Sequence, residues 1–153
     1  MIFAGGCSKD IAGRGGGDIV TDQDIQALRE IEGPLFSYTV SNGGEEDITS
    51  DFHTRTCYDL DHDGTLTRSV CYNISDPEVT ETTISDKDYR TVYGFILDSM
   101  ELGEQDLGRR GCDTPLLTFC YYDEEGERQI LYRCDELGDS QREISDILLS
   151  YFD

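Results

Sequence analysis

The 153-residue sequence contains no uninterrupted apolar run of 18 residues, so no segment is predicted to cross a membrane as a helix. Basic residues are also scarce: 12 Lys and Arg stand against 33 Asp and Glu, which gives a formal net charge of -21. A surface this acidic repels nucleic-acid phosphates and anionic lipid headgroups. We therefore expect no nucleic-acid partner and no electrostatic attachment to a membrane.

Motifs for metal-dependent or nucleophilic catalysis are missing as well. The only histidines are His53 and His62, and no Cys-x-x-Cys spacing occurs, so a zinc ribbon or a thioredoxin-type redox site has no support. The stretch GRGGG precedes every predicted strand and is therefore not a phosphate-binding loop. No flanking sequence resembles the signature of a catalytic nucleophile. We predict that the chain is not an enzyme and, unless it binds calcium as described below, has no cofactor.

The sequence does contain enough apolar material for one folded domain. Hydrophobic residues make up 37% of the chain, with nine Tyr and six Phe. A chain of this length can bury a core without help from disulfides or metals. The first 20 residues end in a glycine-rich stretch that is typical of a flexible linker. We predict a single domain over residues 21–153.

Hydrophobic periodicity predicts both helices and strands in this domain. Apolar residues recur at intervals of three and four, with capping residues in front of them, over 21–33, 85–103 and 139–153. In the last of these helices, Ser140 and Glu143 are predicted to form a capping box. β-branched and aromatic residues around turn signals predict strands and hairpins over 35–44, 51–73, 78–84 and 113–135. The fold predicted is α+β: an antiparallel sheet built from hairpins, with two amphipathic helices packed on one face.

The cysteines allow a disulfide within the first predicted hairpin. Cys57 and Cys71 lie on its two arms. A two-residue turn at Asp63-Gly64 leaves them one residue out of register, whereas a three-residue turn aligns them for a bridge. The alternative is that both are small buried residues. The remaining cysteines, apart from Cys7, are Cys112, Cys120 and Cys134, so an odd number is left and at least one stays free or pairs between chains.

The same hairpin carries an acidic turn that suggests a cation site. Asp59, Asp61, Asp63 and Gly64 match positions one, three, five and six of an EF-hand-like calcium loop. Position twelve is Val70, where a bidentate Glu is expected, and the flanks are predicted strands rather than helices. A polar hairpin turn explains the same residues without metal. A calcium-binding surface module is therefore the alternative function.

The start of the chain resembles the end of a bacterial lipoprotein signal peptide. Ala4-Gly5-Gly6-Cys7 is similar to a lipobox, in which the cysteine receives a diacylglycerol and becomes the new N-terminus. The resemblance departs from the pattern at Ala4, where Leu is usual. The charged region and most of the apolar region of a signal are missing before it. We therefore expect residues 1–20 to be a truncated signal remnant and a linker, with Cys7 as the lipid attachment site.

The order of predicted elements also resembles small uncharacterised α+β lipoproteins of anaerobic Gram-positive gut-type bacteria. The stretches that carry this resemblance are LFSYTVSNGG, LLTFCYYDEEGERQILYRC and EISDILLSYF. The resemblance implies a domain held at the extracytoplasmic face of the cell membrane through the lipid anchor alone. It implies no activity. The leading hypothesis is a non-enzymatic binding domain whose partner is a protein, a peptide or a polymer, with its oligomeric state left open.

Overall fold

The computed structural model describes residues 21–42, 50–108 and 114–152. These residues form a mixed α/β structure with a seven-stranded, mostly antiparallel sheet and three helices, which agrees with the α+β class predicted from the sequence. The helices are α2 (Asp22–Arg29), α3 (Asp86–Leu102) and α4 (Asp139–Ser150). The strands are β1 (Pro34–Ser41), β2 (His53–Asp61), β3 (Thr65–Tyr72), β4 (Glu78–Thr83), β5 (Gln105–Gly108), β6 (Leu116–Tyr122) and β7 (Arg128–Cys134).

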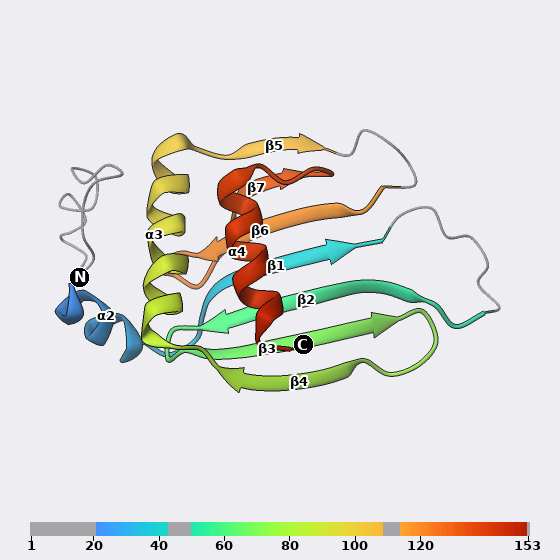
Figure 1. Cartoon of the computed structure of the whole chain (residues 1–153), viewed down its shortest axis with the longest axis horizontal. Coiled ribbons are helices and arrows are strands. Elements are labelled where there is room, and N and C mark those ends of the chain that lie inside the picture. Colours follow the sequence, from blue (N-terminus) through green and yellow to red (C-terminus); the bar gives the residue numbers. More distant parts are fainter. Residues whose placement is uncertain (1–20, 43–49, 109–113, 153) are drawn as a thin grey trace.

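The strand order across the sheet is β4-β3-β2-β1-β6-β7-β5 (Figure 1). The first four strands follow one another as antiparallel neighbours, and β1 then pairs with β6 to join the two halves. Helix α3 carries the chain from the β4 edge to the opposite edge, where β5 pairs in parallel with β7. The strand predicted over 78–84 is β4, which forms one edge of the sheet.

Aromatic side chains from the two halves form the centre of the core. Phe36 and Tyr38 are two residues apart on β1, so their side chains point to the same side of the sheet. The ring of Tyr38 stacks on Phe119 with 4.3 Å between the ring centroids. Phe95 of α3 meets Phe36 edge to face at 6.1 Å, and Ser145 Oγ of α4 donates a hydrogen bond to the Tyr38 hydroxyl at 3.2 Å. Burying each such ring contributes about 1.5–3 kcal/mol. Figure 1 shows α4 crossing the central strands next to α3.

The other side of the same strands carries small polar side chains and thiols. Because side chains alternate along a strand, the residues between Phe36, Tyr38 and their partners point away from the aromatic core. We call this surface the polar face; its central residues are Ser37, Thr39, Arg55, Cys57, Asp59, Thr67, Ser69, Cys71, Thr118 and Cys120.

Local capping signals account for two helix starts and fail at the third. Thr21 forms a capping box with Asp24, and the hydroxyl of Ser85 accepts a hydrogen bond from the Asp88 amide. The capping box predicted for Ser140 and Glu143 is wrong. Helix α4 begins at Asp139 with Gly138 as N-cap, and no side chain caps it. Gly138 still contributes its carbonyl, which accepts the first helical bond from Arg142 N at 2.9 Å.

Candidate functional site

The register of β2 and β3 fixes the neighbours of the two hairpin cysteines on the polar face. Cys57 lies between Thr39 of β1 and Ser69 of β3, and Cys71 lies directly opposite Arg55. Arg55 and Cys57 are two residues apart on one strand and so share a face. Cys57 and Cys71 are therefore diagonal neighbours on the polar face, with Arg55 beside both.

Guanidinium groups and a hydroxyl contact the thiols of this face. The proximity of Cys57 and, to a smaller degree, of Cys71 raises the pKa of Arg55. The Thr39 hydroxyl donates to Cys57 Sγ at 3.9 Å. On the neighbouring half of the sheet, Arg128 Nε donates to Cys120 Sγ at 3.2 Å, and this bond raises the pKa of Arg128. The polar face thus pairs sulfur atoms with positive charge.

We predicted that a three-residue turn would place Cys57 directly opposite Cys71. This prediction is wrong. Strand β2 ends at Asp61 and β3 begins at Thr65, so the turn does have three residues, but they are His62, Asp63 and Gly64. This turn pairs Cys57 with Ser69 rather than Cys71. Diagonal neighbours have Cα atoms about 7–8 Å apart, beyond the usual span of a disulfide. Both residues are free thiols in the structure.

The three aspartates of the calcium hypothesis lie along the end of β2 and its turn. Asp59 faces the polar side between Ser37 and Thr67, whereas the Asp63 carboxylate accepts a hydrogen bond from Thr65 N at 2.9 Å. Burial, followed by the charge of Asp61, raises the pKa of Asp59. Within the part of the chain that the structure describes, no three His, Cys, Asp or Glu side chains are grouped to hold a metal ion. The calcium site stays a prediction, and the turn geometry accounts for Asp63 without metal.

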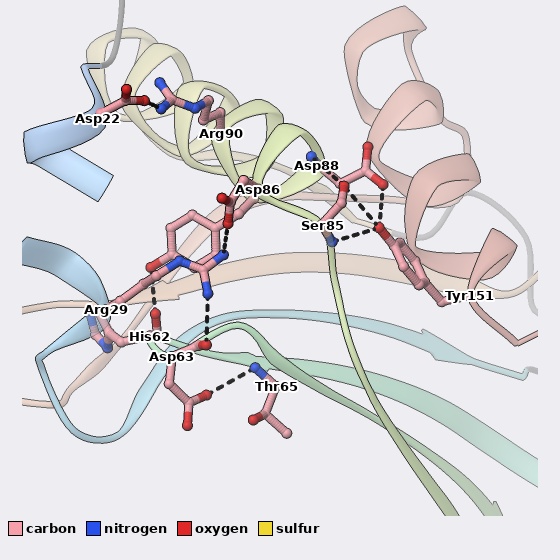
Figure 2. A network of polar contacts seen from close by, with 11 residues as sticks. Asp22, Arg29, His62, Asp63, Thr65, Ser85, Asp86, Asp88, Arg90 and Tyr151 are labelled. Atoms are coloured by element: carbon pink, nitrogen blue, oxygen red, sulfur yellow. Dashed lines mark hydrogen bonds and ion pairs between the residues drawn. The ribbon is translucent and has the colours of Figure 1, made fainter. Parts of the chain in front are cut away.

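A network of polar contacts holds this turn against the helices (Figure 2). Arg29 at the end of α2 donates from Nη1 to the Asp63 carbonyl at 3.1 Å and from Nη2 to Asp86 at 2.7 Å. Its guanidinium lies 4.7 Å from the centroid of the Tyr89 ring. The buried Tyr89 hydroxyl donates to the carbonyl of His62 at 2.7 Å. These contacts tie the turn to α2 and α3, although Arg29 Nε is buried without a hydrogen-bond partner, and we interpret the network as structural.

A groove of about 520 Å³ lies between α3 and α4. Tyr151, just after α4, contacts the Asp88 carboxylate and accepts a hydrogen bond from Ser85 N at 2.9 Å, which joins the two helices at one end (Figure 2). Four carboxylates and two basic groups line the groove, so its net charge is negative. The lining residues are Lys87, Asp88, Thr91, Asp139, Arg142, Glu143, Asp146 and Ile147.

The predicted lipid attachment residue, Cys7, lies outside the described residues, as does Cys112. No helix in the described part of the chain is long and apolar enough to span a membrane. Comparisons with protein families, curated proteins and solved structures found no match. Function therefore has to be argued from the sites themselves.

Sequence reasoning missed two features of these sites. The first is the position of Arg55 beside Cys57. The two residues are two positions apart on a predicted strand, so strand alternation alone predicts that they share a face. The groove has no such signal. Its residues come from two helices whose relative placement depends on the whole sheet.

Proposed function

We propose that the chain is a membrane-anchored, extracytoplasmic lipoprotein domain without enzymatic activity, which binds a basic partner segment in the groove between α3 and α4. The anchor part of the proposal is supported by the lipobox-like Ala4 to Cys7 and the glycine-rich stretch that follows. The binding part depends on one observation, the excess of carboxylates along the groove.

We propose that α3 and α4 are two amphipathic helices packed on one face of a sheet built from hairpins. Their inner sides would then cover the aromatic core, and their outer sides would form a surface that a partner can reach. Glu143 and Asp146 lie on the exposed side of α4, one helical turn apart. A lysine or arginine of a partner would meet both carboxylates together.

Charge favours a basic partner over an acidic one. The chain carries a formal net charge of -21, so an acidic segment would be repelled before it reached the groove. A cation about 4 Å from one carboxylate gains about 1 kcal/mol in water, and more where the surface excludes solvent. The Debye length is about 8 Å at physiological ionic strength, so binding should weaken as salt rises.

The test uses the full chain and a fluorescent octalysine peptide, with binding followed by anisotropy at low and high salt. Glu143→Gln with Asp146→Asn removes two charges from the groove, and Glu124→Gln with Glu125→Gln removes two from the exposed β6–β7 turn. We expect the groove variant to bind about 30-fold more weakly, because two lost contacts of about 1 kcal/mol each amount to about 2 kcal/mol. The turn variant should bind like the unmodified chain. An equal loss in both variants would show attraction to net charge alone and would overturn the groove assignment.

A further inference from the structure

Cys57 and Cys71 form a pair of accessible thiols that the binding proposal does not use. Both are free, both are half-buried, and both lie on the polar face of adjacent strands. By contrast, Cys134 is buried beside Leu117 on the aromatic side, and Cys120 is fully buried. The two half-buried thiols are therefore the pair that a small ligand can reach on this face.

The spacing of the pair suits a bridging metal ion better than a disulfide. A disulfide holds its sulfur atoms about 2.05 Å apart and needs Cα atoms closer than diagonal strand neighbours provide. A metal ion bound by two thiolates holds the sulfur atoms roughly 4.6 Å apart, twice a metal–sulfur bond of about 2.3 Å. That longer bridge reaches across the diagonal without a shift of register.

The number of ligands restricts which ion the pair can hold. Structural zinc takes four ligands, and the described residues contain no group of three or more ligating side chains. Soft thiolates favour Cu(I), which is satisfied by fewer ligands. Asp59, the next carboxylate along the strand, is a hard oxygen ligand with little affinity for such an ion.

Arg55 supplies the charge that such a complex needs. Two thiolates and one monovalent cation leave a net charge of -1. Arg55 lies directly opposite Cys71 and shares a face with Cys57 two residues along the same strand, so it is a neighbour of both cysteines. This positive charge offsets the net negative charge of the complex.

We propose that Cys57 and Cys71 form a two-coordinate site for Cu(I), with Arg55 as the neighbouring countercharge. On binding, each thiol loses its proton to solvent and each sulfur donates an electron pair to the metal. Copper stays in the Cu(I) state, and no electron is transferred. The site is separate from the α3–α4 groove, so the two proposals stand or fall independently.

The experiment titrates the full chain with Cu(I) without oxygen, in a phosphine reductant, against a chromogenic Cu(I) chelator. We expect one tight site in the unmodified chain and in a Cys7→Ser, Cys112→Ser control. Cys57→Ser and Cys71→Ser should each lose at least 100-fold in affinity, whereas Cys134→Ser should lose none. Arg55→Ala should keep the stoichiometry and weaken binding several-fold. Unchanged affinity in Cys57→Ser, or loss of the site in the Cys7, Cys112 control, would overturn the proposal.

A measurement on the unmodified chain keeps the test independent of whether a variant folds. X-ray absorption of the copper complex should show two sulfur ligands and no nitrogen or oxygen ligand. Three sulfur ligands, or a mixed shell, would exclude a site made by Cys57 and Cys71 alone.

Discussion

Asp59 carries its charge where its surroundings make that charge unfavourable. The side chain is half-buried near the end of β2. Burial is the largest cause that raises its pKa, the charge of Asp61 raises the pKa further, and Arg128 partly offsets both. Because the folded-state pKa lies above the ordinary value, the ionised carboxylate destabilises the fold at neutral pH. This cost disappears as the pH falls below the unfolded-state value near 3.8.

Asp59→Asn should therefore stabilise the protein at pH 7. We expect a rise in Tm of no more than a few degrees, because part of the side chain remains screened by solvent. The gain should shrink toward zero at pH 3, where the carboxylate is protonated in both states. Thermal unfolding of the full chain, followed by circular dichroism at both pH values, measures the difference. A variant that is less stable at pH 7 would show that the Asp59 charge is favourably paired.

Asp123 provides the opposite case and a matched control. Its carboxylate accepts hydrogen bonds from the backbone amides of Glu125 and Glu127 at 3.0 and 2.9 Å, and these bonds together with Gln129 lower its pKa. The ionised carboxylate therefore stabilises the fold at pH values above its ordinary pKa. This stabilisation is lost as the pH falls through the lowered pKa of the folded state. Asp123→Asn should therefore lower Tm at pH 7, while Asp59→Asn raises it.

At the scale of single elements, the β2–β3 turn depends on a glycine. Gly64 has a φ of +96°, and a Cβ placed there would lie 2.9 Å from Arg29 Nη1. Gly64→Ala would strain the backbone and displace the guanidinium that ties α2 to the turn. We expect a loss of about 1–3 kcal/mol in the free energy of unfolding, measured by urea denaturation.

Gly94 is the control for that substitution. It lies inside α3, and a Cβ there would meet no atom within 4 Å. Gly94→Ala should raise the free energy of unfolding by about 0.5–1 kcal/mol, because alanine loses less conformational entropy than glycine when a helix forms. Equal effects at the two positions would contradict the role assigned to the positive φ at Gly64.

Elements with strong local signals could be predicted from the sequence, and those that depend on distant partners could not. Helix α3 was predicted within one residue at each end, because Ser85 caps its start and Gly103, with a φ of +85°, ends it. Strand β5 was missed. It has only four residues and is held by parallel pairing with β7, a contact with no local signature.

The same limit applies to the candidate sites. Strand alternation predicts that Arg55 and Cys57 share a face. Which residue of β3 lies opposite Cys57 depends on whether the turn begins at His62 or at Asp63, and the acidic sequence there fits both. A three-residue turn that begins at Asp63 would place Cys57 opposite Cys71. The turn in the structure begins at His62, so the two cysteines are diagonal neighbours instead.

At the scale of the whole molecule, the strand order depends on two pairings between strands that are not consecutive, β1 with β6 and β5 with β7. Strands β1 and β6 meet with Tyr38 opposite Phe119, which joins the two halves of the sheet. The hydrophobic periodicity of a strand predicts which of its side chains share a face, but it does not predict which strand pairs with it. The groove between α3 and α4 follows from that pairing, so it could not be predicted before the fold was known.

The proposed membrane anchor is also a property of the whole molecule, and the proposal depends on Cys7. If the lipobox-like sequence is processed, the native protein should start at Cys7 and carry the added mass of a diacylglycerol. Intact mass spectrometry of the protein recovered from its own membranes measures this directly. Cys7→Ser should move the protein from the membrane fraction to the soluble fraction, while Cys134→Ser, which changes a buried thiol, should not. An unmodified native chain that keeps Met1 would contradict the lipoprotein proposal and leave the α3–α4 groove as a binding site without a membrane.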